Sequence, residues 1–214
     1  MIYFVRVGFP IKLNSGGIPI PRFSKTEKEN IRHNLLIEGE RLFSAHGLKK
    51  VTIDDLIAAA NIAKATFYTF YESKEYLYLD ILQGIQKKIF LELDTLLENN
   101  ADLPGKERVK QVFNRMAQLM VHYPILSQVD PSIADLVSRK VSKERLAAFI
   151  SQNLDAAQSL HNHGVCFLCE VRTASMIFQT LYRCYITMGI GVPEEQAAAI
   201  DIMLNGIIDK IIAE

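Results

Sequence analysis

The chain has 214 residues, of which 49% are hydrophobic and 22% charged, and its basic and acidic residues are equal in number. This composition is typical of a globular protein and excludes a chain that is disordered throughout. No apolar run reaches the roughly 18–20 residues of a membrane helix, and the first 21 residues do not follow the charge pattern of a signal peptide. We therefore expect a cytoplasmic protein with no membrane partner, in which three cysteines remain reduced thiols.

The first predicted element is a helix over residues 25–46, preceded by an irregular extension over residues 1–24. Leu35, Gly39, Leu42 and Phe43 recur with the spacing of one helix face. Gly47 follows in the position where a left-handed residue commonly ends a helix. Charge supports a separate role for this end of the chain, because the first 77 residues carry 11 basic and 8 acidic side chains.

Two short helices and a long one are predicted next. Thr52 with Asp55 forms the capping-box pattern at the start of the first short helix. Asn61 is a residue that tolerates the left-handed conformation of a tight turn. A second short helix is expected over residues 63–71. Ser73 is expected to cap a long helix to about residue 98, in which Leu77, Ile81, Ile85 and Ile89 recur every fourth residue.

A short helix, a turn, a second short helix and a long helix make up a helix-turn-helix domain, which we expect over residues 25–75. The second short helix would lie in the major groove of DNA, braced by the first. We expect Lys64, Thr66 and Thr69 to face outward from it. The residues expected at the DNA-binding surface are Thr52, Ala63, Lys64, Ala65, Thr66, Tyr68, Thr69 and Lys74.

The stretch from about residue 29 to residue 83 resembles the tetracycline-repressor (TetR) family of transcriptional regulators. The positions in register with the family pattern are Thr52, Leu56, Ala60, Ile62, Lys64, Thr66, Phe67, Tyr68, Phe70, Ser73, Lys74, Glu75 and Leu77. The departures are Asp54, Ile57, Asn61, Ala63 and Ala65, which replace residues that the family commonly has there. The resemblance implies a DNA-binding dimer with an effector-binding second domain.

Residues 76–214 are predicted to form that second, helical domain. Further helices are expected over residues 104–122, from Pro131, and over residues 142–160, 170–188 and 193–212. Strand alternation is absent from the pattern, so the predicted class is all-α. Aromatic and methionine side chains suggest an adaptable pocket for an apolar or aromatic effector, lined by Phe113, Met116, Met120, Tyr123, Phe149 and Tyr182.

A broad apolar stripe on the last two helices has two interpretations. One is ordinary core packing, and the other, which the family resemblance favours, is a two-fold interface. The interface residues expected are Phe178, Leu181, Tyr185, Ile200, Met203, Leu204, Ile207, Ile208 and Ile211.

The segment HNHGVCFLC brings His161, His163, Cys166 and Cys169 close together in sequence. Zinc prefers such ligands, but a second Cys-x-x-Cys half-site is absent, and buried apolar cysteines explain the pattern more simply. We therefore expect no metal and no cofactor. The sequence also contains no catalytic constellation, which argues against an enzyme.

These observations predict a homodimeric regulator, with repression the expected action, that binds a palindromic double-stranded DNA operator and releases it when a small molecule binds. One alternative is a DNA-bound assembly or cell-division factor on the same fold, which would have a protein partner and no ligand.

Overall fold

The computed structural model describes residues 23–128, 130–151, 156–187 and 194–213, and these ranges are helical nearly throughout. The helices are α1 (Lys25–His46), α2 (Ile53–Ala60), α3 (Lys64–Phe70), α4 (Lys74–Asn99), α5 (Gly105–His122), α6 (Pro124–Ser127), α7 (Pro131–Lys140), α8 (Lys143–Ser151), α9 (Ala156–Asn162), α10 (Val171–Thr187) and α11 (Glu194–Ile211). The described ranges contain no β-strand, only an isolated bridge between Phe167 and Ile212. The predicted all-α class is confirmed. The predicted extension over residues 1–24 lies outside the described residues, except for its last two.

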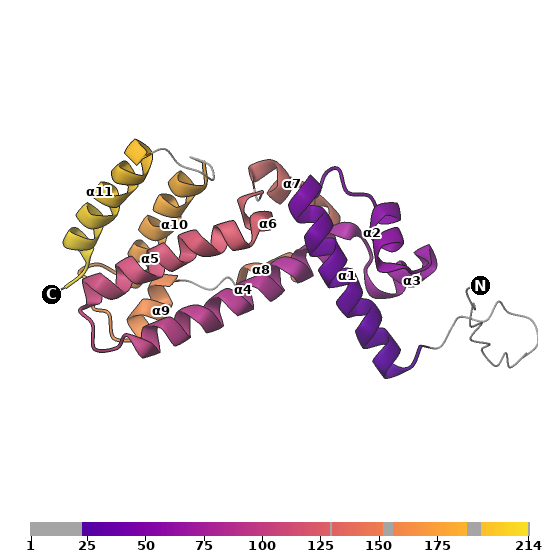
Figure 1. Ribbon diagram of the computed structural model, residues 1–214, viewed down its shortest axis with the longest axis horizontal. Helices are drawn as coiled ribbons and strands as arrows, with labels where there is room; N and C mark the ends of the chain where they lie inside the picture. Colours follow the sequence, from indigo (N-terminus) through magenta and orange to yellow (C-terminus); the bar gives the residue numbers. More distant parts are fainter. Residues whose placement is uncertain (1–22, 129, 152–155, 188–193, 214) are drawn as a thin grey trace, which may run out of the picture.

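The molecule is elongated, with α1, α2 and α3 grouped at one end (Figure 1). Helix α4 runs from this group to the opposite end of the molecule, and α5 packs against α4. Helices α9, α10 and α11 lie at that far end. Because α4 is part of both groups, it connects the three N-terminal helices mechanically to the rest of the chain.

Side-chain caps determine where several helices begin. Ser24 starts α1 with a complete capping box, and Thr52 does the same for α2 through Asp55. Asp130 accepts hydrogen bonds from the first free N–H groups of α7, which begins with Pro131, as predicted. Ser73 occupies the N-cap position of α4, but its side chain makes no capping hydrogen bond, which corrects the prediction for that residue.

The N-terminal core forms where α1 crosses α4. Leu35, Gly39 and Phe43 on α1 are buried, while Leu42 remains partly exposed. A β-carbon on Gly39 would lie only 2.9 Å from the Cδ1 atom of Ile81, so the missing side chain permits this close crossing. The Phe43 and Tyr78 rings meet edge to face, with centroids 5.3 Å apart.

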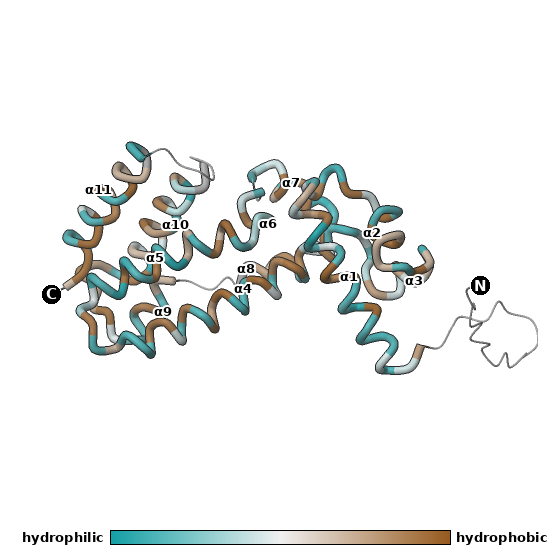
Figure 2. Tube along the Cα trace, in the orientation of Figure 1, coloured by the Kyte–Doolittle hydropathy of each residue, from teal (hydrophilic) through white to brown (hydrophobic). Residues whose placement is uncertain are grey.

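The apolar repeat of α4 continues this core along the molecule. Leu77, Ile81, Ile85 and Ile89 are all buried, as their fourfold spacing predicts. Hydrophobic and hydrophilic residues alternate along the helices, as expected for amphipathic helices packed against one another (Figure 2). Within the described residues, no helix combines the length and apolarity needed to cross a membrane.

Polar contacts join the N-terminal group to α7 and to the residue that follows α6. The Gln128 side chain, next to α6, donates a hydrogen bond to the Ser44 carbonyl of α1 at 2.6 Å. The Lys49 ammonium donates to the Ser132 hydroxyl of α7 at 2.5 Å. The N-terminal group is thus held by α4 and also by helices that follow it in the chain.

We predict that stability falls at alkaline pH because of buried tyrosines. Burial raises the pKa of Tyr78 to about 12, and that of Tyr71 also to about 12, from the ordinary value of 10.0. Between pH 10 and about pH 12, these two tyrosines have lost their hydroxyl protons in the unfolded chain but keep them in the folded chain. The free energy of unfolding should therefore fall by about 1.4 kcal/mol per pH unit for each such tyrosine.

The Tyr78→Phe variant isolates this effect, because the Tyr78 hydroxyl is buried without a hydrogen-bond partner among the described residues. Urea denaturation near pH 8 should show little loss of stability. Near pH 11, the variant should have lost less of its stability than the natural chain. Equal losses for the two proteins would show that Tyr78 does not control the alkaline transition.

Candidate nucleic-acid interface and ligand cavity

The turn between α2 and α3 has the geometry of a helix-turn-helix. Asn61 adopts φ 52° and ψ 50°, the left-handed conformation predicted for it. The residue before Asn61, Ala60, is buried. Leu56 of α2 and Phe67 of α3 are also buried and anchor the two helices in the core. The tight turn therefore sets α3 at a fixed angle across α2.

Helix α3 has one buried side and one exposed side. Ala63, Lys64, Ala65, Tyr68 and Thr69 are exposed, as is Thr52 at the start of α2. Tyr68 is 51% exposed, and its ring lies edge to face against Phe67. All of these exposed residues were expected at the DNA-binding surface.

Thr66 does not face outward as predicted, because it is only 9% exposed. Ile62, Thr66 and Phe70 are spaced four residues apart, and the two apolar members are partly buried. The helical period thus places Thr66 on the inner side of α3. The prediction relied on its polar side chain and gave too little weight to this period.

Lys64 at the start of α3 is paired with Asp54 of α2, with 2.9 Å between the ammonium nitrogen and the carboxylate oxygen. Both side chains are more than half exposed. The hydrogen bond to Asp54 raises the pKa of Lys64, so the ammonium remains charged. A solvent-exposed pair of this kind is weak, so a phosphate can compete for the ammonium. The residues are ten apart in the chain, a spacing from which sequence analysis does not reveal a pair.

Lys74 lies in the first turn of α4, and its ammonium points at the loop between α1 and α2. It donates hydrogen bonds to the carbonyl oxygens of Leu48 at 2.8 Å and Val51 at 2.6 Å, with Lys49 further away at 3.5 Å. This differs from the expectation that the Lys74 side chain lies at the DNA-binding surface. In the structure, it holds the loop that positions α2.

The first turn of α4 has no side-chain cap. The Ser73 hydroxyl at the N-cap position is buried and has no partner among the described residues. The first N–H groups of α4 are consequently free of side-chain acceptors. Such groups attract an anion, because they carry the positive end of the helix dipole.

A cavity of ≈ 260 Å³ lies in the C-terminal part of the chain, between α5, α9 and α10. It brings together three residues of the predicted pocket, namely Phe113, Met116 and Tyr182. Phe149 instead lines a separate groove beside α4, α7 and α8. Met120 and Tyr123 line neither space, and Met120 is buried in the core.

Sequence analysis missed four polar or aromatic residues of α10 that also line this cavity. These are Ser175, Phe178, Gln179 and Arg183. The first three share one helix face with Tyr182, because they stand seven, four and three residues before it. The sequence shows that these residues share a face of α10, but it does not show that α5 and α9 pack against that face.

Most of the predicted interface stripe is buried inside the subunit. Phe178, Leu181, Ile200, Leu204, Ile208 and Ile211 are each at most 9% exposed in the single chain. For these six residues core packing is the correct interpretation. Tyr185 and Ile207 are half-buried, and Met203 is 39% exposed.

A different set of apolar side chains is exposed on the last two helices. Ile202 on α11 is 71% exposed and Met176 on α10 is 66% exposed. A β-carbon on Gly206 of α11 would meet no atom within 4 Å. This surface is open to close approach by another helix.

The His-Cys segment begins in the last turn of α9, at His161, and continues into the loop before α10. A His163 ring nitrogen is 2.8 Å from the Ser159 carbonyl, Cys166 is exposed and Cys169 is half-buried. Among the residues that the structure describes, no three His, Cys, Asp or Glu side chains come together to hold a metal ion.

Comparison with known proteins supports the assignment of α1, α2 and α3 to a helix-turn-helix domain. Residues 35–81 match the sequence model of the family described as bacterial regulatory proteins, tetR family. EthR of Mycobacterium tuberculosis, an HTH-type transcriptional regulator, is 35% identical over 68 residues. This match spans only 32% of EthR and 32% of this chain.

Two longer matches extend into the C-terminal part. YhgD, an uncharacterized HTH-type transcriptional regulator of Bacillus subtilis, is 23% identical over 158 residues, or 71% of this chain and 80% of YhgD. The crystal structure of a TetR family transcription regulator from Marinobacter aquaeolei VT8 has a TM-score of 0.58 at 18% identity, covering 89% of this chain and 100% of that one. At this identity the structural match shows the fold alone.

The different contacts of Lys74 and Lys64 predict different effects of replacing them by methionine. Lys74→Met leaves the carbonyls of Leu48 and Val51 without their donor, so it should lower the free energy of unfolding by about 1–3 kcal/mol. Lys64→Met should change stability little, because its only ion pair among the described residues is exposed. Urea denaturation of both variants checks this. A Lys74→Met protein as stable as the natural chain would contradict the positioning role.

Proposed function

We propose that this chain is a regulator of the TetR type, which represses transcription by binding a DNA operator and releasing it when a small molecule binds. The observation that carries the proposal is the exposed side of α3. Ala63, Lys64, Ala65, Tyr68 and Thr69 are exposed there, while Phe67 anchors the helix in the core. A short helix braced in this way fits the major groove.

The proposed contacts divide into two kinds. Lys64 and the first turn of α4 bind phosphates, which positions the protein without reading sequence. The small side chains Ala63 and Ala65 let α3 approach the base edges closely. The Tyr68 hydroxyl contacts the DNA backbone. Thr69, the next residue of α3, is exposed beside it. Protection mapping of the DNA upstream of its own gene and the neighbouring genes would identify the operator and the regulated genes.

Two subunits act together in the proposed complex. A dimer with two-fold symmetry would place two α3 helices about 34–36 Å apart, so that they enter successive major grooves of a near-palindromic site. We assign its interface to the exposed apolar residues of α10 and α11. Met176, Ile202 and Met203 supply the apolar surface, and Gly206 permits the helices to approach.

The cavity beside α10 is the proposed effector site. An effector releases DNA only if it binds more tightly to a conformer in which the two α3 helices are wrongly spaced. Helix α5 lines the cavity and leads directly into α6, beside which Gln128 contacts Ser44 of α1. This path supports a ligand-controlled regulator over a DNA-bound assembly factor without a ligand.

Replacing Tyr68 by phenylalanine tests the contact with DNA. The Tyr68→Phe protein should fold normally, because the ring packing against Phe67 is retained. Its affinity for the operator should fall by about fivefold to tenfold, the effect of one lost hydrogen bond. Fluorescence anisotropy with labelled operator DNA measures this. Unchanged affinity would limit Tyr68 to a packing role.

Lys64→Met provides the complementary measurement. It should weaken binding to all DNA sequences about equally. The slope of log binding constant against log salt concentration should become less steep by about one unit. Tyr68→Phe is the control, since it removes no charge and should leave the salt dependence unchanged.

Two neighbouring residues of α11 distinguish the interface from the core. Ile202 is 71% exposed and Leu204 is 3% exposed. Ile202→Asp should therefore give a folded monomer that binds the operator only weakly. Leu204→Asp should unfold the C-terminal part, because it buries an unpaired carboxylate. Sedimentation equilibrium and circular dichroism separate these outcomes. A folded Ile202→Asp protein that remains dimeric would place the interface elsewhere.

A further inference from the structure

The cavity between α5, α9 and α10 has walls that are apolar on nearly every side. Val109, Val112 and Met116 line it from α5, and Leu160 lines it from α9. Phe113 meets Tyr182 edge to face, with ring centroids 5.7 Å apart. Walls of this kind select an aliphatic or aromatic body and would repel a strongly hydrated one.

The Tyr182 hydroxyl adds a specific polar requirement. Its oxygen is buried and has no hydrogen-bond partner within the described part of the chain. Burial raises the pKa of Tyr182 far above its ordinary value, so the group stays protonated and can donate a hydrogen bond. An unpaired buried hydroxyl is costly in a native protein, and an acceptor atom on a ligand in this cavity would relieve that cost.

Arg183 supplies the cavity's charge. It is the one formally charged residue among those described as lining the cavity, and this lining contains no aspartate or glutamate. Arg183 forms no ion pair with any residue that the structure describes, although other arginines of the chain do. Its side chain is exposed, so the charge lies toward the solvent side of the cavity.

We propose that the effector of this cavity is an amphipathic monoanion, with an apolar or aromatic body and a single carboxylate or comparable acidic group. The body lies against Phe113, Met116 and Leu160. The anionic group lies at the side of the cavity where Tyr182 and Arg183 follow one another on α10. This inference rests on the proposed effector site, and it specifies which class of molecule occupies that site.

Two fluorescent probes with the same ring system test the charge requirement. 8-Anilino-1-naphthalenesulfonate carries an anionic group, and N-phenyl-1-naphthylamine is its uncharged counterpart. Fluorescence titration of the full chain should show tighter binding of the anion. Arg183→Gln should weaken binding of the anion by about fivefold and leave binding of the neutral probe unchanged. Tyr182→Phe should also weaken binding of the anion.

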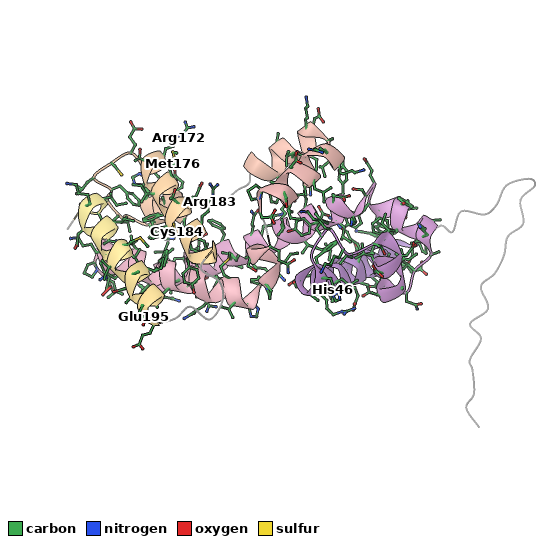
Figure 3. The ribbon with its side chains drawn as sticks, turned by 90° about the horizontal axis from the view of Figure 1, so that it is seen from above. His46, Arg172, Met176, Arg183, Cys184 and Glu195 are labelled. Atoms are coloured by element: carbon green, nitrogen blue, oxygen red, sulfur yellow. The ribbon has the colours of Figure 1, made fainter. Side chains whose placement is uncertain are left out.

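Arg172→Gln is the matched control, because Arg172 lies on the same helix, is exposed and does not line the cavity (Figure 3). It should leave binding of both probes unchanged. Met116→Trp should fill the cavity and prevent binding of both probes, which locates them in this space. Circular dichroism shows whether each variant is folded.

The proposal is overturned if the neutral probe binds as tightly as the anion, or if Arg172→Gln and Arg183→Gln have the same effect. It is also overturned if a folded Met116→Trp protein binds both probes as the natural chain does. None of these titrations contains DNA. A protein that selects the anion but does not bind operator DNA would contradict the proposed regulatory function and leave the ligand class standing. A protein that binds operator without selecting the anion would do the reverse.

Discussion

The structure depends on one carboxylate of α4, the helix shared by both parts of the molecule. Asp80 accepts a hydrogen bond from Arg32 of α1 at 2.8 Å and from the Tyr71 hydroxyl, after α3, at 3.1 Å. Arg145 of α8 binds its other oxygen. The Asp80 side chain is only 16% exposed, so losing one partner would leave a largely buried charge poorly compensated. The position of the helix-turn-helix relative to α8 is therefore coupled to a single residue.

This constraint gives the proposed regulation a physical route. Besides the apolar packing of α1 on α4, the N-terminal group is hydrogen-bonded to Asp80, to Gln128 beside α6 and to Ser132 of α7. These hydrogen bonds are directional, so a small shift of α6, α7 or α8 changes several of them together. A ligand that displaces α5 would act on the same set through α6. Packed helices respond to such shifts by moving as units, which would alter the spacing of the two α3 helices in a dimer.

Sequence reasoning succeeded where the signal is local. The capping box at Thr52, the left-handed Asn61 and the buried fourfold repeat from Leu77 depend on residues a few positions apart, and the structure has each of them. It failed where the partner is distant in the chain. Lys74 binds carbonyls more than twenty residues away, and Leu204 packs in its own subunit. Spacing along a helix shows that a face is apolar, but it does not show whether that face meets the same chain or another one.

The sequence by itself determined the class of fold and the helix-turn-helix, because caps, turns and helical periods are encoded by neighbouring residues. The tertiary structure decided which side of α3 is exposed and where the Lys74 ammonium is directed. It also decided which residues enclose the cavity beside α10, since that space exists only where α5 and α9 pack against Ser175, Gln179 and Tyr182. Such features arise when burial of apolar surface brings distant segments of the chain together. A local sequence pattern does not show which distant segments will be in contact.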